Sequence, residues 1–185
     1  MSLILFSSAG GHLVLPERAS LLASRENGGN LVVHPPRPVW ERSELTPGEL
    51  TLFAFLVAAA GRAMLDVLPQ LAGGCINYWE AGNWALNDEA EPKGRKEARS
   101  HRSMHLHLLG RSPASTDPAW PWGESPRFPA FAEKESWAAR FECFTAEECR
   151  AIVTRADALL RGTYGVRDDQ LAPWSCDCDG YPAPR

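Results

Sequence analysis

The sequence predicts an α+β domain, because segments with strand-like patterns flank a long segment with a helical pattern. Residues 103–109 alternate strictly between apolar and polar side chains, which is typical of a half-buried strand. Residues 30–34 and 75–79 are also predicted to be strands. Between these two segments, apolar residues recur at helical spacing from position 50 to position 68. A sheet with one long helix packed on it accounts for these patterns.

The chain before the long helix is expected to contain short extended pieces and one tight turn. Residues 11–16 and 19–25 are predicted to be extended, and residues 26–29 carry an Asn-Gly-Gly signal that favours a hairpin into residues 30–34. Prolines at positions 35, 36 and 38 then exclude a helix. The chain should therefore remain extended until shortly before position 46.

Thr46 predicts the start of the long helix. It is a favourable N-cap residue, Pro47 suits the first helical position, and Glu49 stands where it can complete a capping box. One apolar stripe follows, made of Leu50, Phe53, Val57, Ala60, Met64 and Leu68. This stripe predicts packing of the helix in the core against the sheet.

The rest of the chain is expected to contain a long loop, an ordered wrap and a second helix. Residues 80–102 are charged and interrupted by glycine and proline, which indicates a surface loop. The Pro- and Trp-rich stretch up to position 129 should wrap against the domain through three aromatic side chains, those of Trp120, Trp122 and Phe128. Thr145 and Glu148 predict a second capped helix that ends near Gly162.

Length and charge narrow the class of protein. A chain of 185 residues fits a single domain. The formal net charge of -4 provides no general attraction for a nucleic-acid backbone, so we expect no nucleic-acid partner. No basic segment precedes the first apolar residues, and no uninterrupted apolar run approaches about 18 residues. We therefore expect a soluble, cytoplasmic protein without a membrane partner.

The cysteines do not predict a disulfide framework. Their number, five, is odd, and their spacing is unlike that of small secreted domains, so reduced thiols are expected. Cys176 and Cys178 stand two residues apart near the end of the chain. They lack the second pair of ligands that a structural zinc site requires, and we expect no metal there.

His105 and His107 are the strongest candidates for chemistry. They lie two apart on the alternating strand, so they point to the same face, roughly 7 Å apart, opposite Met104 and Leu106. The spacing alone is equally compatible with a hydrogen-bonded pair on a half-buried strand. His101 is in phase with the same face, so a zinc site of three histidines is an alternative, although one short strand disfavours their convergence.

The residues around this pair resemble the signature of the histidine-triad family. Ser103-Met-His105-Leu-His107-Leu-Leu is similar to the family pattern His-φ-His-φ-His-φ-φ, with Ser103 in the place of the first histidine. Residues 29–39 and 43–50 are similar to the family's strand, proline turn and helix opening, and residues 75–77 lead to the histidine strand in the family's order. The resemblance covers about residues 11–112.

Two departures from the family pattern indicate a divergent branch. Asn30 stands where many members carry an additional histidine. The insert between Asn77 and Ser103 is longer than the family's usual loop.

The resemblance implies an α+β fold whose antiparallel sheet pairs with that of a second copy across a two-fold axis, in a homodimer. Residues 1–112 would form the histidine-triad-like domain, and residues 113–185 would form a C-terminal extension packed on the same domain.

The same resemblance implies an enzyme that acts on small nucleotides at the α-phosphorus, without a metal or other cofactor. His105, the middle histidine, would be the nucleophile, with one ring nitrogen held by a backbone carbonyl. His107 would donate to phosphate oxygens or to the leaving group, whereas Ser103 could hydrogen-bond an oxygen without protonating it. The substrate would be a dinucleoside polyphosphate or a nucleoside phosphoramidate.

Four further residues are candidates for nucleotide binding. Asn30, Asn77 and Asn83 would supply neutral donors, and Arg111 would supply positive charge just past the histidine strand. Trp79 and Trp84 could stack on a base, although aromatic residues beside a sheet more often pack in the core or in a lid. Two other functions remain open, a nucleotide-binding module without catalysis and a zinc-dependent hydrolase.

Overall fold

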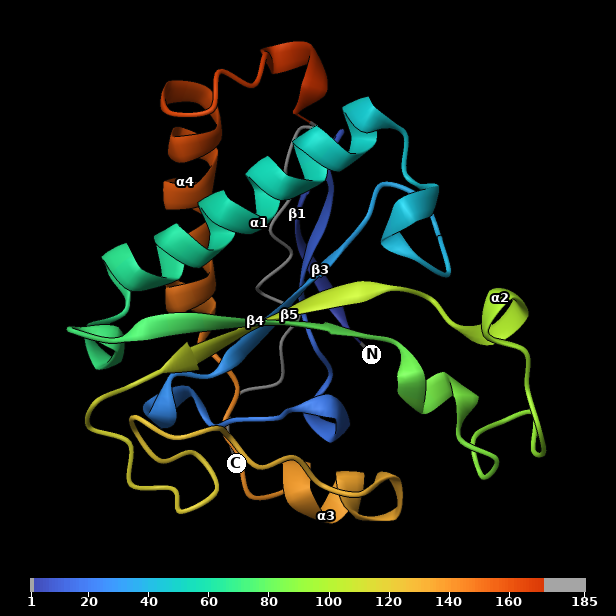
Figure 1. Ribbon diagram of the computed structural model, residues 1–185. Coiled ribbons are helices and arrows are strands. Elements are labelled where there is room, and N and C mark those ends of the chain that lie inside the picture. Colours follow the sequence, from blue (N-terminus) through green and yellow to red (C-terminus); the bar gives the residue numbers. More distant parts are fainter. Residues whose placement is uncertain (1, 172–185) are drawn as a thin grey trace.

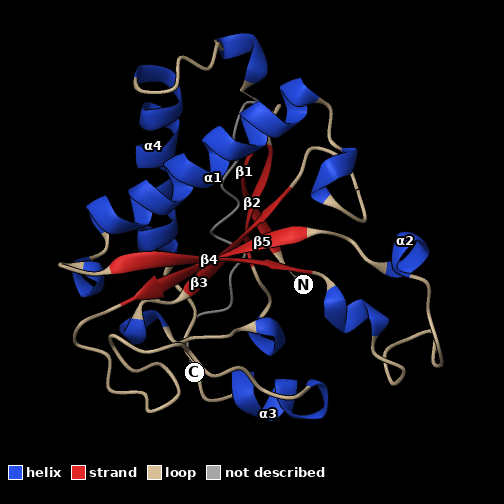
Figure 2. Cartoon of the chain, viewed as in Figure 1, coloured by secondary structure: helices blue, strands red, loops and turns tan. Residues whose placement is uncertain are grey.

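A five-stranded antiparallel sheet forms the centre of the protein in the computed structural model, which describes residues 2–171 (Figures 1 and 2). In spatial order the strands are β1 (Leu3–Ser8), β2 (Gly11–Leu15), β3 (Asn30–His34), β5 (His105–Arg111) and β4 (Cys75–Ala81). All neighbouring strands run antiparallel. The predicted α+β class, with an antiparallel sheet and a long helix packed on it, is confirmed.

The long helix α1 (Pro47–Val67) begins where the capping signal predicted. The Thr46 hydroxyl accepts a hydrogen bond from the Glu49 backbone N–H, and the Glu49 carboxylate accepts one from the Thr46 backbone N–H. The predicted stripe is wrong at Leu50, which is 38% exposed, whereas Leu56 is fully buried. Leu56 is buried because both the sheet and a second helix cover α1, which makes its buried face wider than one stripe.

Helix α1 is long and apolar enough, by length and composition alone, to cross a membrane. Its buried residues belong to the main core, on the side of the sheet where helix α4 (Ala146–Gly162) also lies (Figure 1). The predicted cap of α4 is confirmed, since Thr145 and Glu148 form a second capping box. Arg155 on α4 forms an ion pair with Asp66 on α1 at 2.7 Å.

The other face of the sheet is covered by irregular segments and by the short helix α3 (Lys134–Ala138) (Figure 1). The prediction of an extended segment and a hairpin over residues 19–29 is wrong, because this part forms short 3-10 turns, Arg18–Ser20 and Arg25–Asn27. The Leu22 backbone N–H donates to Asn30 Oδ1, and the Leu22 carbonyl oxygen accepts from the Trp137 indole N–H, so side chains take the backbone groups that a neighbouring strand would otherwise pair with.

Gly28 does not form a hairpin turn but allows the loop backbone to pass close to β5. Its φ angle is +117°, a region that favours glycine. A Cβ atom on Gly28 would lie 2.3 Å from the carbonyl oxygen of Gly110, so the loop backbone passes directly against β5. A tight hairpin does occur earlier in the chain, where it joins β1 to β2. Strand β1 itself was not predicted from the sequence.

The loop between β4 and β5 begins and ends two positions later than predicted, at residues 82–104, and it contains short helical elements. Strand β4 continues to Ala81, a 3-10 turn follows at Asn83–Leu86, and α2 (Ala98–His101) forms one helical turn before β5. Strand β5 begins at His105, so Ser103 precedes the strand instead of opening it.

The Trp-rich wrap is ordered, but only part of its predicted anchor is buried. Trp120 is 1% exposed and its indole N–H donates to the Gly110 carbonyl oxygen at 3.0 Å. Phe128 stacks on Trp79 with ring centroids 4.4 Å apart. Trp122 is 45% exposed, so the prediction that it anchors the wrap is wrong.

The cysteines in the described part of the chain are free thiols: Cys75, Cys143 and Cys149. Burial raises the pKa of the Cys149 thiol to about 12, which keeps it protonated. The pair Cys176 and Cys178 lies outside the described residues.

Candidate functional site

The face of the sheet opposite α1 carries a cluster of imidazole rings. On β5, Leu106 and Leu108 enter the main core, and therefore His105 and His107 point to the other face, as predicted. The register places Val32 on β3 and Trp79 on β4 beside His107. The two histidine rings lie 5.0 Å apart between centroids.

A cavity of about 430 Å³ opens over these histidines. Four segments form it: the irregular chain before β3, the end of β3, the end of β4 with the turn after it, and the start of β5 with the residues just before it. Its lining comprises Ser20, Leu22, His34, Trp79, Ala81, Gly82, Asn83, Trp84, Ala85, Ser103, His105 and His107. This set combines imidazoles with apolar and aromatic surface, the composition typical of a small-molecule site.

His105 is held in one tautomer by the backbone. Its Nδ1 lies 3.0 Å from the carbonyl oxygen of Ser103. A carbonyl oxygen can only accept, so Nδ1 carries the proton and the other ring nitrogen, Nε2, keeps its lone pair. Burial lowers the pKa of His105, and the positive charge of Arg102 lowers it further. The imidazole is therefore neutral at pH 7, with one nitrogen available as a nucleophile or base.

His107 lies deeper in the same site. It is 8% exposed, and its ring stacks on Trp79 with centroids 5.4 Å apart. Burial, His105 and His34 together lower its pKa to about 3. Its Nδ1 is buried and has no hydrogen-bond partner among the described residues, so this polar atom is unsatisfied.

His34, at the end of β3, is a pocket residue that the sequence analysis did not single out. Its ring centroid lies 5.3 Å from that of His105. Burial, followed by His105 and His12, lowers its pKa to about 4. The available signal was strand alternation, because residues 30, 32 and 34 share one face of β3.

Two more of the predicted residues line this cavity. Ser103 has an exposed side chain at the pocket edge, and its backbone carbonyl orients His105. Asn83 is on the turn after β4, where its Oδ1 accepts a hydrogen bond from Arg102 at 3.3 Å.

The structure places the other three predicted binding residues outside the cavity lining. Asn77 is exposed on β4, opposite Leu109. The Oδ1 of Asn30 accepts a hydrogen bond from the Leu22 backbone N–H, so this side chain supports the segment that carries Leu22.

Arg111 lies at the far end of β5. It is 3% exposed and donates to the carbonyl oxygens of Pro121 and Glu124. Its guanidinium also stacks over Trp120, 5.1 Å from the ring centroid. Arg111 therefore holds the Trp-rich wrap against the sheet through these hydrogen bonds and this stacking contact.

Arg102 supports the pocket from behind. Its side chain is 11% exposed and forms ion pairs with Glu41 and Glu80. It also donates to the backbone carbonyl of Trp40. Arg102 thus links the end of β4 to the loop before α1. In the sequence it directly precedes Ser103, whose carbonyl oxygen orients His105.

The zinc alternative required His101 to converge with the two strand histidines. His101 lies on α2, is exposed, and has its Nδ1 3.1 Å from the Glu97 carbonyl oxygen. It does not line the cavity. Within residues 2–171, no group of three or more His, Cys, Asp or Glu side chains is arranged to hold a metal ion.

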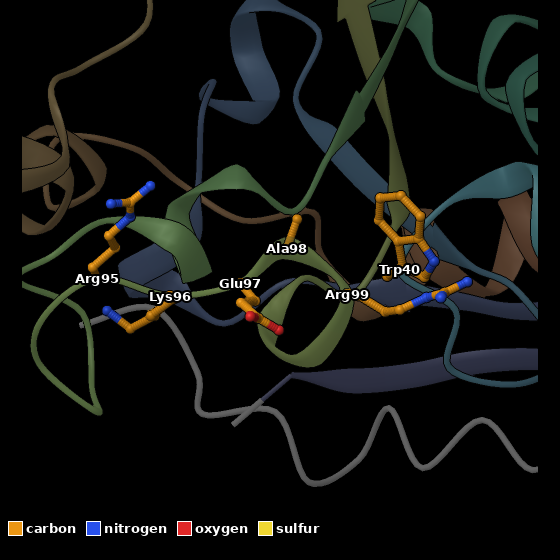
Figure 3. Close-up of a pocket in the computed structure, with 6 residues that line it drawn as sticks. All are labelled: Trp40, Arg95, Lys96, Glu97, Ala98 and Arg99. Carbon is orange, nitrogen blue, oxygen red and sulfur yellow. The ribbon is translucent and has the colours of Figure 1, made fainter.

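A larger hollow of about 860 Å³ lies along the loop before α2 (Figure 3). Its lining comprises Trp40, Arg95, Lys96, Glu97, Ala98 and Arg99. Arg95, Glu97 and Arg99 are exposed, and the residues that line the hollow include no imidazole, hydroxyl or thiol. The smaller histidine cavity is the better candidate because the oriented reactive groups are there.

No protein-family model matches the chain, and no curated protein matches it. A histidine triad protein from Sinorhizobium meliloti 1021 aligns with 83% of this chain and 89% of its own, at 19% identity and a TM-score of 0.46. A histidine triad protein from Marinobacter aquaeolei VT8 aligns with 75% and 85%, at 21% identity and a TM-score of 0.43. The function proposed below therefore depends on the residues of the histidine cavity and on the sequence pattern around them.

Proposed function

We propose that this protein is a nucleotide hydrolase or nucleotidyl transferase of the histidine-triad type, with His105 as the nucleophile. The observation that carries the proposal is the hydrogen bond between His105 Nδ1 and the Ser103 carbonyl oxygen. It leaves a neutral imidazole with a free lone pair beside a cavity large enough for a small ligand.

The chemistry would proceed in two displacements. In the first, His105 Nε2 forms a bond to the α-phosphorus, and the bond from phosphorus to the leaving group breaks. The nucleotidyl-imidazole carries a positive charge, which the Ser103 carbonyl oxygen stabilises through the proton on Nδ1. In the second, water or another acceptor attacks the phosphorus, the P–N bond breaks, and His105 returns to its neutral form.

The remaining cavity residues suit a nucleotide in complementary ways. The His107 ring lines the cavity, where it can hydrogen-bond a phosphoryl oxygen. Asn83 adds a neutral polar group at the edge of the cavity. Trp84 and Leu22 provide apolar surface against which a base or ribose can pack. Substrates would be dinucleoside polyphosphates or nucleoside phosphoramidates.

A binding module without catalysis is the second candidate function. It is favoured by two features: Ser103 stands in place of the first histidine of the family pattern, and the cavity lining within the described residues includes no lysine or arginine. A site with this composition could retain a nucleotide without stabilising the charge that develops during phosphoryl transfer.

Hydrolysis assays distinguish the two functions. A substrate panel of diadenosine polyphosphates, adenosine phosphoramidate and a nucleotide sugar is given to the wild type, to His105→Ala and to His101→Ala as the control for an exposed histidine. We expect turnover by the wild type and His101→Ala, no turnover by His105→Ala, and a nucleotidyl adduct on the wild type in mass spectra of quenched reactions. Full activity of His105→Ala would contradict the nucleophile, and calorimetric binding without turnover would support the binding module.

We further propose a cytoplasmic homodimer. Strand β4 is an edge of the sheet, with unpaired backbone groups available for pairing with a second copy. Light scattering should give twice the 20.3 kDa mass of one chain. A single-chain mass would exclude the dimer.

A further inference from the structure

We propose that His34 is a further catalytic residue, which protonates the leaving group and then takes a proton from the attacking water. The proposal rests on the nucleophilic role of His105 proposed above. Its basis is that His34 and His105 lie on neighbouring strands and face the same cavity, with ring centroids 5.3 Å apart. A substrate atom bonded to the phosphorus that His105 attacks would lie within reach of His34.

His34 belongs to a row of polar side chains that crosses the sheet. His12 on β2 is paired with His34, and Ser7 on β1 is paired with His12. The Ser7 hydroxyl lies 2.8 Å from His12 Nδ1. The row continues through His34 to His105. His34 therefore has a polar neighbour on each side, His12 on β2 and the proposed nucleophile His105 on β5. Ser7 and His12 are both partly exposed, so the row leads from His34 toward solvent.

The charges around His34 suit an acid that is formed only when substrate is bound. In the free protein His34 is neutral, because burial, His105 and His12 all lower its pKa, to about 4. The groups that face it are His12 on β2 and His105 and His107 on β5, with Arg102 beside His105. A phosphate-bearing ligand brings negative charge into this cluster, which raises the pKa of the nearest imidazole by roughly 1–3 units.

His107 is less suited to this role than His34. Its pKa, about 3, is lower, and it is 8% exposed beneath the ring of Trp79. His34 has a partly exposed ring on the cavity wall. Of these two rings, His34 is therefore the one that takes up a proton with an anionic ligand, while His107 remains a neutral donor to a phosphoryl oxygen.

The protons balance over the two displacements. Substrate binding brings one proton from solvent to His34. When the bond from phosphorus to the leaving group breaks, this proton moves to the leaving group and His34 becomes neutral. When water attacks the nucleotidyl-His105, His34 takes a proton from the water and the P–N bond breaks. Release of the nucleotide returns that proton to solvent.

Proton NMR with ¹⁵N-labelled histidine tests the proton uptake directly. The chain has five histidines, so each ring can be assigned with single variants. We expect saturating AMP to raise the pKa of His34 by about 1–3 units and to leave the ring signals of exposed His101 in place. An unchanged His34 pKa in the presence of bound AMP would overturn the proposal.

Leaving-group dependence supplies the second test. We compare His34→Gln with the wild type on the para-nitrophenyl ester of AMP, whose leaving group departs without a proton, and on an N-alkyl phosphoramidate of AMP, whose amine requires one. The variant should lose about 10²–10⁴-fold in kcat/KM on the phosphoramidate and less than about 10-fold on the ester. His101→Gln is the matched control and should match the wild type on both.

The outcomes separate the two proposals. Equal losses on the two substrates, with circular dichroism spectra like those of the wild type, would overturn the role of His34 and leave His105 as nucleophile. Wild-type protein that neither binds AMP nor cleaves any of these compounds would overturn the proposed function and the role of His34 with it.

Discussion

The imidazole of His107 is stacked against the indole of Trp79, with ring centroids 5.4 Å apart and the planes inclined by 29°. Trp79 in turn stacks on Phe128 from the wrap that follows β5. The deepest histidine of the candidate site is therefore shielded from water by residues from two distant parts of the sequence. This burial is the main cause of its lowered pKa.

Replacing Trp79 should uncover His107. In Trp79→Leu, water reaches the imidazole and stabilises its charged form, so the pKa of His107 should rise from about 3 toward its ordinary value. Histidine NMR over a pH series measures the shift. Trp122→Leu is the matched control, since Trp122 is 45% exposed and should have no effect. A His107 pKa that is the same in both variants would show that Trp79 does not shield it.

Stability should fall as the pH is lowered from 7 to 5, and His107 should account for part of the fall. Its pKa is about 3 in the folded protein and near 6.5 when unfolded, so between these values only the unfolded chain binds the proton. The free energy of unfolding then drops by about 1.4 kcal/mol per pH unit, or about 2 kcal/mol between pH 6.5 and pH 5. His34, with a pKa of about 4, acts in the same direction.

Urea unfolding at pH 7 and pH 5 measures this contribution. His107→Leu removes the titrating group, so its free energy of unfolding should fall by about 2 kcal/mol less than that of the wild type over this range. An equal fall in both proteins would mean that His107 is not held neutral in the folded state.

Arg102 should matter for both stability and the site. Arg102→Met leaves Glu41 without its cation and Glu80 with only Arg42, and we expect a loss of about 2–3 kcal/mol because the guanidinium is largely buried. The exposed pair of Arg18 with Glu142 is the control, and Arg18→Met should cost less than about 1 kcal/mol. The pKa of His105 should also rise in Arg102→Met, since the guanidinium lowers it. Similar losses in the two variants would refute a special role for Arg102.

Ser103 should contribute through its backbone more than through its hydroxyl. The Ser103 carbonyl oxygen orients His105, and alanine retains that carbonyl. We expect Ser103→Ala to keep kcat/KM within about 10-fold of the wild type, well above the His105→Ala value. Steady-state kinetics on the most active substrate measures both. A loss as large as that of His105→Ala would give the hydroxyl a direct catalytic role.

The sequence predicted elements most reliably where the signal is local. Both capping boxes are confirmed, because an N-cap and the residue three positions later interact within one helical turn. The alternation on β5 correctly separated Leu106 from His105 and His107, because successive side chains of a strand point to opposite faces. The prediction of an extended segment at residues 19–25 was wrong, because Leu21 and Leu22 are buried against residues far away in the sequence.

By itself, then, the sequence determined the α+β class, the helix starts and the face on which His105 and His107 lie, since each depends on residues a few positions apart. Only the tertiary structure decided which other groups share that face. It brought in His34 and Trp79 through strand pairing, and it placed Asn77 and Arg111 outside the cavity. The physical reason is that pairing register and the path of the wrap are set by packing between distant segments, which no local pattern encodes.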